Sequence, residues 1–170
     1  MRCRRGCGCG CGRSPFASSL PALCSQRIFD FVTYALRHDL IRFFEERRIA
    51  GVVGVYLFGS HAENRAHRQS DVDVGVLLDW DHFPSRRQRF ELRMKLASEL
   101  MGACKRDVDV VILNDAPPEL AKHVAVEGSC VLNADAEQNH AFVRDAQLRA
   151  ADIAPFLRRT RRIKLETLRK

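Results

Sequence analysis

The order of apolar and polar residues predicts helices that alternate with short strands. Residues 34–50 place apolar side chains at helical spacing among charged ones, which predicts an amphipathic helix ending at Gly51. The run VVGVYLF, residues 52–58, is nearly all apolar, as expected of a strand that is covered on both faces. Three further strands are expected, over residues 71–79, 107–114 and 130–132.

A second helix is expected around residues 86–103. Apolar residues recur in it at spacings of four, three and four, which favours a stripe that faces the core: Phe90, Met94, Ala97 and Met101. The arginines of the same segment are expected to form a solvated helix face, with contact to an acidic partner as the alternative: Arg86, Arg87, Arg89 and Arg93.

Two more helices are expected in the last third of the chain. Pro117-Pro118 opens a short helix that reaches Val126. Asp135 can cap the last helical segment, in which Pro155 is expected to kink or split the helix. The alternation of helices and strands predicts an α/β fold, more narrowly α+β, in which helices pack on a small mixed β-sheet.

The size and composition of the chain favour one globular domain. The chain has 170 residues, of which 46% are hydrophobic. That content excludes disorder throughout the chain. No run approaches the roughly 18 to 20 consecutive apolar residues that a membrane-spanning helix needs, so no membrane association is expected.

The net charge of +7 is concentrated at the two ends of the chain. Residues 1–27 carry five arginines and no acidic residue, and residues 158–170 carry seven Lys or Arg against one Glu, which leaves the body at about −4. Because basic tails are usually solvated, direct nucleic-acid binding is not expected, with phosphate binding by the tails as the alternative.

Residues 1–30 are expected to be a disordered basic leader rich in Cys, Gly and Arg. Five of the seven cysteines lie in the first 24 residues, and the C-x3-C-x-C-x-C spacing of the first four lacks the C-x2-C pairs of a structural zinc site. The segment also lacks the apolar core of a secretory signal, and it resembles an organelle transit peptide only weakly. A cytoplasmic protein is therefore expected.

Three aspartates are candidates for binding a metal ion. The strand period of two places Asp71 and Asp73 on one face, and Asp109 lies on the next strand. If these strands are neighbours, three carboxylates meet on one sheet face, and such an oxygen site suits Mg²⁺. The alternative for Asp71 and Asp73 alone is a solvated pair at the start of a strand.

Gly59 and Ser60 directly follow the first buried strand. A Gly-Ser turn that leads into a helix lets backbone N–H groups and a hydroxyl approach a phosphate closely. Taken alone this dipeptide is a weak signal, and a plain turn is the alternative.

Together these residues resemble a known family. FGSHAENRAHRQSDVDVGVLLD is similar to the G-S-x10-D-x-D signature of the DNA polymerase β-like nucleotidyltransferase superfamily in its minimal form, and DVDVVILNDAPPEL resembles the strand of its third carboxylate. The likeness covers about residues 36–165. Glu63 and Asn64 depart from the small or basic residue and the Gly that are common there. Four other loop residues are expected to be solvated, with a supply of positive charge to the phosphates as the alternative for the two arginines: His61, Arg65, His67 and Arg68.

The resemblance implies a role for each candidate residue. Gly59 and Ser60 would hold the β- and γ-phosphates of ATP, and Asp71 and Asp73 would bind two Mg²⁺ ions. Asp109 would complete the catalytic metal site and help the acceptor hydroxyl lose its proton. The implied organisation is a nucleotidyltransferase domain over residues 34–134 and a C-terminal helical segment with a basic tail over residues 135–170.

The small size of the chain indicates the class of acceptor. Minimal proteins of this shape resemble antitoxins paired with HEPN-domain ribonuclease toxins, and the likeness implies transfer of AMP from ATP to a tyrosine of the toxin. One alternative is a nucleotidyltransferase acting on a small molecule of the aminoglycoside type. The other is a non-catalytic antitoxin that neutralises its partner by contact.

Overall fold

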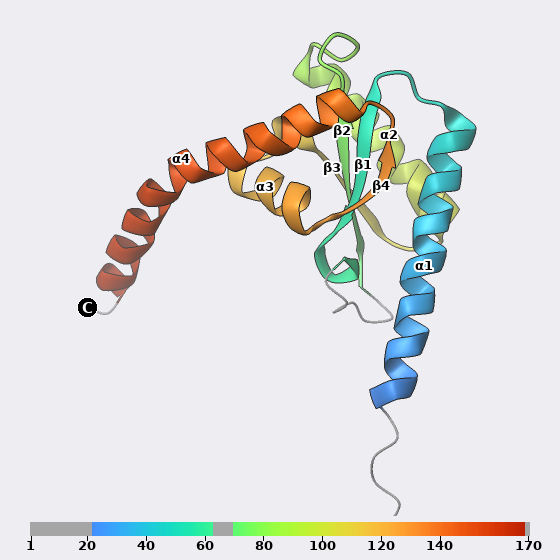
Figure 1. Ribbon diagram of the computed structural model, residues 1–170, viewed down its shortest axis with the longest axis horizontal. Helices are drawn as coiled ribbons and strands as arrows, with labels where there is room; N and C mark the ends of the chain where they lie inside the picture. The colour runs from blue at the N-terminus through green and yellow to red at the C-terminus, as the bar shows by residue number, and fades with distance from the viewer. Residues whose placement is uncertain (1–21, 63–69, 169–170) are drawn as a thin grey trace, which may run out of the picture.

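The computed structural model of the chain describes residues 22–62 and 70–168, with side chains from Tyr34 onward. The four strands are β1 (Val52–Phe58), β2 (Val72–Leu78), β3 (Val108–Ile112) and β4 (Ser129–Asn133). The four helices are α1 (Ala22–Arg47), α2 (Arg86–Cys104), α3 (Pro118–Glu127) and α4 (Ala136–Leu168) (Figure 1). Two short 3-10 turns follow β1 and β3: η1 (Gly59–His61) and η2 (Leu113–Asp115).

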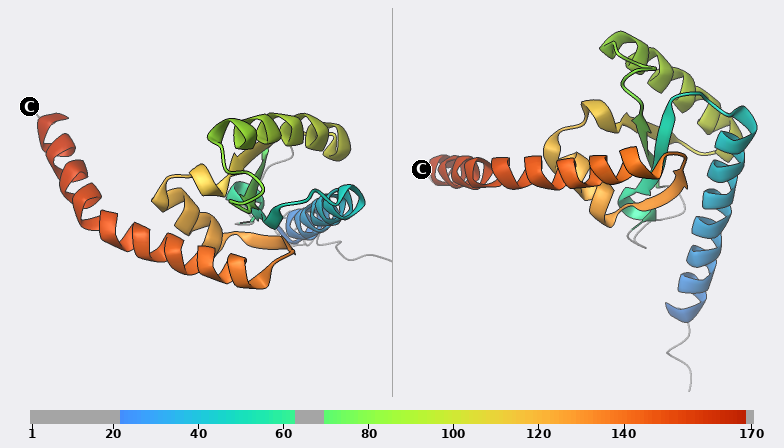
Figure 2. Two further views of the ribbon diagram at one scale, coloured as in Figure 1. Left: turned by 90° about the horizontal axis from the view of Figure 1, so that it is seen from above. Right: turned by 45° about the horizontal axis from the view of Figure 1, so that its top comes forward.

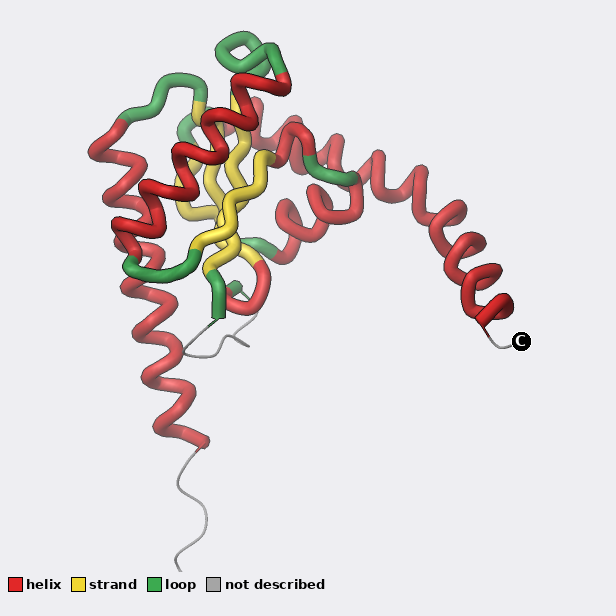
Figure 3. The backbone as a smooth tube through the Cα atoms, turned by 180° about the vertical axis from the view of Figure 1, so that it is seen from behind, coloured by secondary structure: helices red, strands yellow, loops and turns green. Residues whose placement is uncertain are grey.

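The four strands form one mixed sheet in the order β3-β2-β1-β4. β1 pairs antiparallel with β2 and β4, whereas β2 and β3 are parallel. Helices α1 and α2 cover one face and α3 and α4 the other (Figure 2). From behind, α2 lies across the sheet with α1 beside it (Figure 3). The predicted α/β fold with a small mixed sheet is confirmed.

Alternating side chains of the strands build a separate core on each face. Val72, Val74 and Val76 are fully buried with the apolar side chains of α1 and α2. Tyr56 and Leu77 point to the other face and pack with residues of α3 and α4. Residues of β2 that lie between the three valines, Asp73 among them, therefore face the α3 side.

Helix α1 is longer than the pattern predicted. It was expected over residues 34–50, but it begins at Ala22, within the segment expected to be a leader, and ends at Arg47. Arg48 takes a φ of 40° and Gly51 a φ of 82°, so the left-handed backbone after Arg47 stops the helix early. Residues 1–21, with all but one of the N-terminal cysteines, lie outside the described part.

Helix α2 buries a different face from the one expected. Phe90 and Met94 are 56% and 55% exposed, whereas Leu96 and Leu100 are fully buried. The helix carries two apolar stripes, and Leu96 lies about 200° around the axis from Met94, so only one stripe can face the sheet. The leucine stripe packs against the β2 and β3 valines, and the prediction of a core stripe through Phe90, Met94 and Met101 is wrong.

Helix α4 is continuous from Ala136 to Leu168, with Pro155 inside it. Asp135 caps it as predicted, since its Oδ1 accepts from the backbone N of Gln138 at 3.0 Å. The helix bends rather than splits, and its last part projects away from the body (Figure 2). Among residues 22–62 and 70–168, every helix is too short or too polar to cross a bilayer.

Candidate active site

Asp73 and Asp109 lie side by side at the start of two neighbouring strands. The parallel register of β2 and β3 pairs Asp73 directly with Asp109. Val74 and Val110, the next residues along each strand, are fully buried in the core on the α1 and α2 side. Both carboxylates therefore extend from the opposite face of the sheet. Because β2 and β3 are paired, the condition that these two strands be neighbours is met.

Gly59 brings the end of β1 against the Asp73 carboxylate. Phe58, the last residue of β1, pairs with Asp73 across the antiparallel ladder. Gly59 has a φ of +69°, and a Cβ at this position would overlap Oδ2 of Asp73. Only glycine meets both requirements, the left-handed backbone and the close approach. Ser60 follows in η1, so the Gly-Ser bend adjoins the carboxylates.

The electrostatics around Asp73 fit a cation. Burial raises the pKa of this carboxyl, and the negative charges of Asp109 and Asp71 raise it further. Asp71 itself is exposed, one residue before β2 begins. Across residues 34–62 and 70–168, no group of three or more His, Cys, Asp or Glu side chains is placed to hold a metal ion, so the structure does not bring Asp71 into one such group with Asp73 and Asp109. The Asp73 and Asp109 pair supplies two adjacent oxygen donors whose mutual repulsion a divalent ion would relieve.

Arg93 contacts the carboxylate of Asp109, which the sequence pattern did not predict. Its Nε donates to the backbone O of Val110 at 2.6 Å, and its Nη2 donates to Oδ1 of Asp109 at 3.2 Å. The expectation that Arg93 is merely solvated is wrong. Arg93 lies one helical turn after Arg89 and one turn before Leu96, so it is on the same side of α2 as the buried leucines. Choosing the leucine stripe as the buried face would therefore have placed Arg93 toward β3.

His61 is also placed differently from the expectation. It is 1% exposed, not solvated, because η1 turns it inward beneath the bend. Its Nε2 lies 3.4 Å from the backbone O of Ser70, so the residues on either side of positions 63–69 are in contact. Burial lowers the pKa of its imidazole. The other loop residues singled out from the sequence lie outside the described part: Glu63, Asn64, Arg65, His67 and Arg68.

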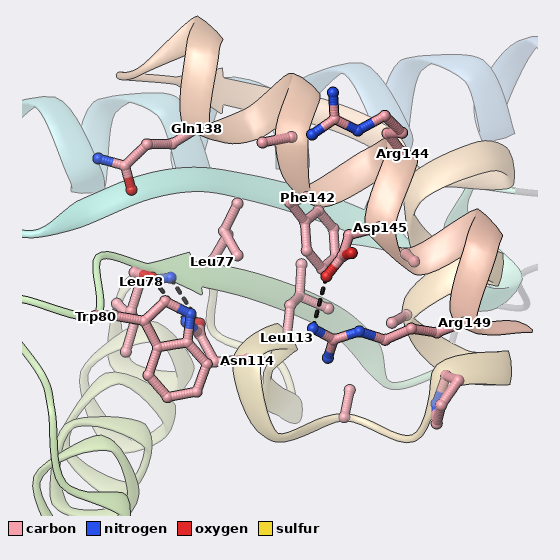
Figure 4. Close-up of a pocket in the computed structure, with 15 residues that line it drawn as sticks. Leu77, Leu78, Trp80, Leu113, Asn114, Gln138, Phe142, Arg144, Asp145 and Arg149 are labelled. Carbon is pink, nitrogen blue, oxygen red and sulfur yellow. Dashed lines mark hydrogen bonds and ion pairs between the residues drawn. The ribbon is translucent and has the colours of Figure 1, made fainter.

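The cavity drawn in Figure 4 is a separate feature from the carboxylates. It has a volume of about 300 Å³ and lies where β2 ends, between Trp80, Asn114 and the first half of α4. Asn114 there accepts from the backbone N of Leu78 at 2.9 Å and donates to its O at 2.8 Å. Asp73, at the start of β2, does not line this cavity.

Comparison with known proteins identifies the family. The model of the polymerase β nucleotidyltransferase family matches residues 38–137. The protein adenylyltransferase MntA of Shewanella oneidensis is 40% identical over 76 residues, which cover 44% of this chain and 49% of that protein. The matched stretch thus spans about half the length of this curated relative.

Solved structures support the same assignment. One chain of a toxin–antitoxin crystal structure with AMP-PNP matches with a TM-score of 0.54 and 25% identity over 79% of this chain and 98% of that chain. One chain of a structure of the tri-AMPylated Shewanella oneidensis HEPN toxin in complex with MNT antitoxin matches in fold, with a TM-score of 0.55 and 20% identity over 81% of this chain and 99% of that chain. With more than half of its residues matched by the family model, this chain belongs to the polymerase β nucleotidyltransferase family.

Proposed function

We propose that this chain is a Mg²⁺-dependent nucleotidyltransferase that transfers AMP from ATP to a tyrosine hydroxyl of a HEPN ribonuclease toxin, and so acts as its antitoxin. The observation that carries the proposal is the pairing of Asp73 with Asp109 directly beside the Gly59 bend. The similarity to an adenylyltransferase, to a toxin–antitoxin structure with AMP-PNP and to the fold of a complex with an AMPylated HEPN toxin supports the nucleotide and the partner.

In the proposed site, the carboxylates bind the metal ions and the Gly59-Ser60 bend binds the phosphates. Asp71, Asp73 and Asp109 would hold two Mg²⁺ ions, which neutralise charge on the phosphates when bound. The backbone N–H groups at Gly59 and the Ser60 hydroxyl would bind the β- and γ-phosphates. Because Gly59 has no Cβ to overlap with Asp73, the bend can lie this close to the proposed metal ligands.

The proposed reaction is an in-line substitution at the α-phosphorus of ATP. The oxygen of the acceptor hydroxyl forms a bond to the α-phosphorus while the bond from that phosphorus to the bridging oxygen of the β-phosphate breaks. Pyrophosphate leaves with the electron pair of the broken bond. The hydroxyl proton passes to solvent, and Asp109, whose side chain is 58% exposed and thus open to an incoming acceptor, would assist this loss as a ligand of the catalytic metal.

A macromolecular acceptor fits the small size of the catalytic unit. The family match runs from the last part of α1 to the start of α4, and within it Asp109 is 58% exposed at the edge of the sheet, which leaves room for a large acceptor. A purely structural role for the carboxylates is disfavoured, because the negative charge of Asp109 repels that of Asp73 and adds to the rise in the Asp73 pKa. Because ATP is the proposed donor, we also propose a cytoplasmic location.

The test combines the purified chain with α-labelled ATP, Mg²⁺ and a HEPN toxin. Intact-mass measurement should show the toxin gaining whole AMP units. Asp71→Asn and Asp73→Asn should each slow the transfer by at least about 100-fold. Asp107→Asn is the matched control, since Asp107 is an exposed acid just before β3 that no step uses, and it should keep full activity.

Two outcomes would contradict the proposal. Toxin neutralised without any mass gain, and equally well by Asp73→Asn, would indicate a non-catalytic antitoxin. Label transferred to an aminoglycoside in place of the toxin would indicate a small-molecule enzyme.

A further inference from the structure

Arg93 links helix α2 to the edge of the sheet at the third carboxylate. Its helix covers the α1 side of the sheet, whereas Asp109 extends from the other side, so the side chain passes around the edge strand β3 to reach it. Two hydrogen bonds fix the guanidinium there, one to the backbone O of Val110 and one to Oδ1 of Asp109. The group therefore contacts the carboxylate from outside the sheet.

Asp109 has little else around it to fix its orientation. β3 is an edge strand, so Asp109 has a neighbouring strand on one side only. Its side chain is 58% exposed and that of Arg93 is 41% exposed. A carboxylate that is this exposed rotates readily, and metal ligands in proteins are commonly held in place by a hydrogen bond from a neighbouring group.

We infer that Arg93 is a positioning residue for the metal site, which holds Oδ1 of Asp109 and leaves Oδ2 to bind the divalent ion. The inference rests on the proposed function. The backbone O of Val110 anchors Nε, so the position of the guanidinium is set by the strand that carries Asp109 itself. A lysine could not replace it, because a single ammonium lacks the rigid fork that reaches both acceptors.

The test measures binding of Mn²⁺ alone, without ATP or toxin, from the electron paramagnetic resonance signal of the free ion. Mn²⁺ uses the same oxygen ligands as Mg²⁺. Arg93→Gln and Arg93→Lys should weaken Mn²⁺ binding by about 10-fold or more. Arg87→Gln is the matched control, because Arg87 lies on the same helix and forms an exposed ion pair of 2.8 Å with Glu91, and it should leave the affinity unchanged.

A double-mutant cycle shows whether Arg93 acts through Asp109. In an Asp109→Asn background, Arg93→Gln should cause no further loss of Mn²⁺ affinity. Arg93→Gln should lower the melting temperature in EDTA only slightly, since the pair with Asp109 is exposed and only the hydrogen bond to the Val110 backbone O is lost besides. Mn²⁺ binding that is unchanged or tighter in Arg93→Gln, or an equal loss in both backgrounds, overturns the inference.

The same titration separates this inference from the proposed function. If Asp73→Asn and Asp109→Asn bind Mn²⁺ as tightly as the wild type, the proposed metal site is wrong and both proposals fail. If those two variants lose affinity while Arg93→Gln does not, the metal site stands and only the role of Arg93 is overturned.

Discussion

Asp73 occupies a position that costs the protein stability when no cation is present. Its carboxylate lies against Gly59 and beside Asp109, and burial together with the neighbouring negative charges raises its pKa. A raised pKa means that the folded chain favours the protonated form more than the unfolded chain does. Ionisation of Asp73 therefore lowers the free energy of unfolding, which is typical of a site kept for binding.

We predict that Asp73→Asn raises the melting temperature in EDTA at neutral pH by about 2–4 °C. The stability associated with protonated Asp73 is fully present below the ordinary carboxyl range and is lost as the pH rises through the raised folded-state pKa. Wild type and variant should thus melt together at strongly acidic pH and separate as the pH rises. Thermal scans followed by circular dichroism would measure this.

Asp107→Asn serves as the control for that measurement, because the exposed Asp107 should leave the melting temperature unchanged. A variant Asp73→Asn that melts below the wild type in EDTA at neutral pH would contradict the charge argument.

The sequence predicted the positions of the carboxylates but not their contacts. Strand periodicity is enough to place Asp73 and Asp109 opposite the buried valines, because the side-chain period of two holds in any strand. The hydrogen bonds of Arg93 and the burial of His61 depend on how α2 and η1 pack on the sheet. Such contacts depend on tertiary structure, which local periodicity does not determine.

At the scale of elements, one buried arginine ties α2 to the turn after β3. Arg89 is 5% exposed, and its Nε and Nη2 each donate to Asp115 at 2.9 Å. Its Nη1 donates to the backbone O of Phe83 at 2.8 Å, and its guanidinium lies 4.5 Å from the centre of the Trp80 ring. This arginine was expected to be solvated, and the structure shows it to be a structural tie.

We predict that Arg89→Met lowers the free energy of unfolding by about 2 kcal/mol, because it leaves Asp115 and the backbone O of Phe83 without their donor. Urea titration would measure the loss. The hydrogen bonds from Arg89 also lower the pKa of Asp115. Their stabilisation is present above the ordinary carboxyl range and lost as the pH falls through the lowered folded-state pKa, so the difference should shrink in acid.

Arg87→Met is the matched control for Arg89, since the Arg87 pair with Glu91 is exposed and its loss should cost less than about 0.5 kcal/mol. Equal losses in the two variants would contradict the assignment of Arg89 as a structural tie.

The sequence predicted elements better than it predicted their faces and ends. All four strands and the start of α2 at Arg86 were expected within one or two residues. The start of α1 was not, because the segment before Tyr34 has no clear amphipathic pattern. Helix α2 has two apolar stripes, and the sequence pattern does not show which one is buried. In the structure the leucine stripe is buried, where it packs against β3 and where Arg89 binds Asp115.

At the scale of the whole molecule, α4 divides into a packed part and a projecting part. Asn139, Ala146 and Ala150 are buried, and Asn139 accepts a hydrogen bond from the Tyr56 hydroxyl at 2.5 Å. From residue 158 to residue 168 every side chain is exposed, and this segment carries most of the C-terminal positive charge. Arg161 ties it to Glu119 of α3 through an exposed ion pair of 3.2 Å.

We predict that ending the chain after Leu157 changes the free energy of unfolding by less than about 1 kcal/mol. The removed residues bury no apolar side chain, and exposed ion pairs such as Arg161 with Glu119 contribute little. Ala150→Glu, in the packed part of the same helix, should cost more than about 2 kcal/mol, because it forces a charge into the contact with the body. Urea titration would measure the free energy of unfolding of both variants. A larger loss in the truncated chain than in Ala150→Glu would show that residues 158–168 support the fold and are not a separate basic tail.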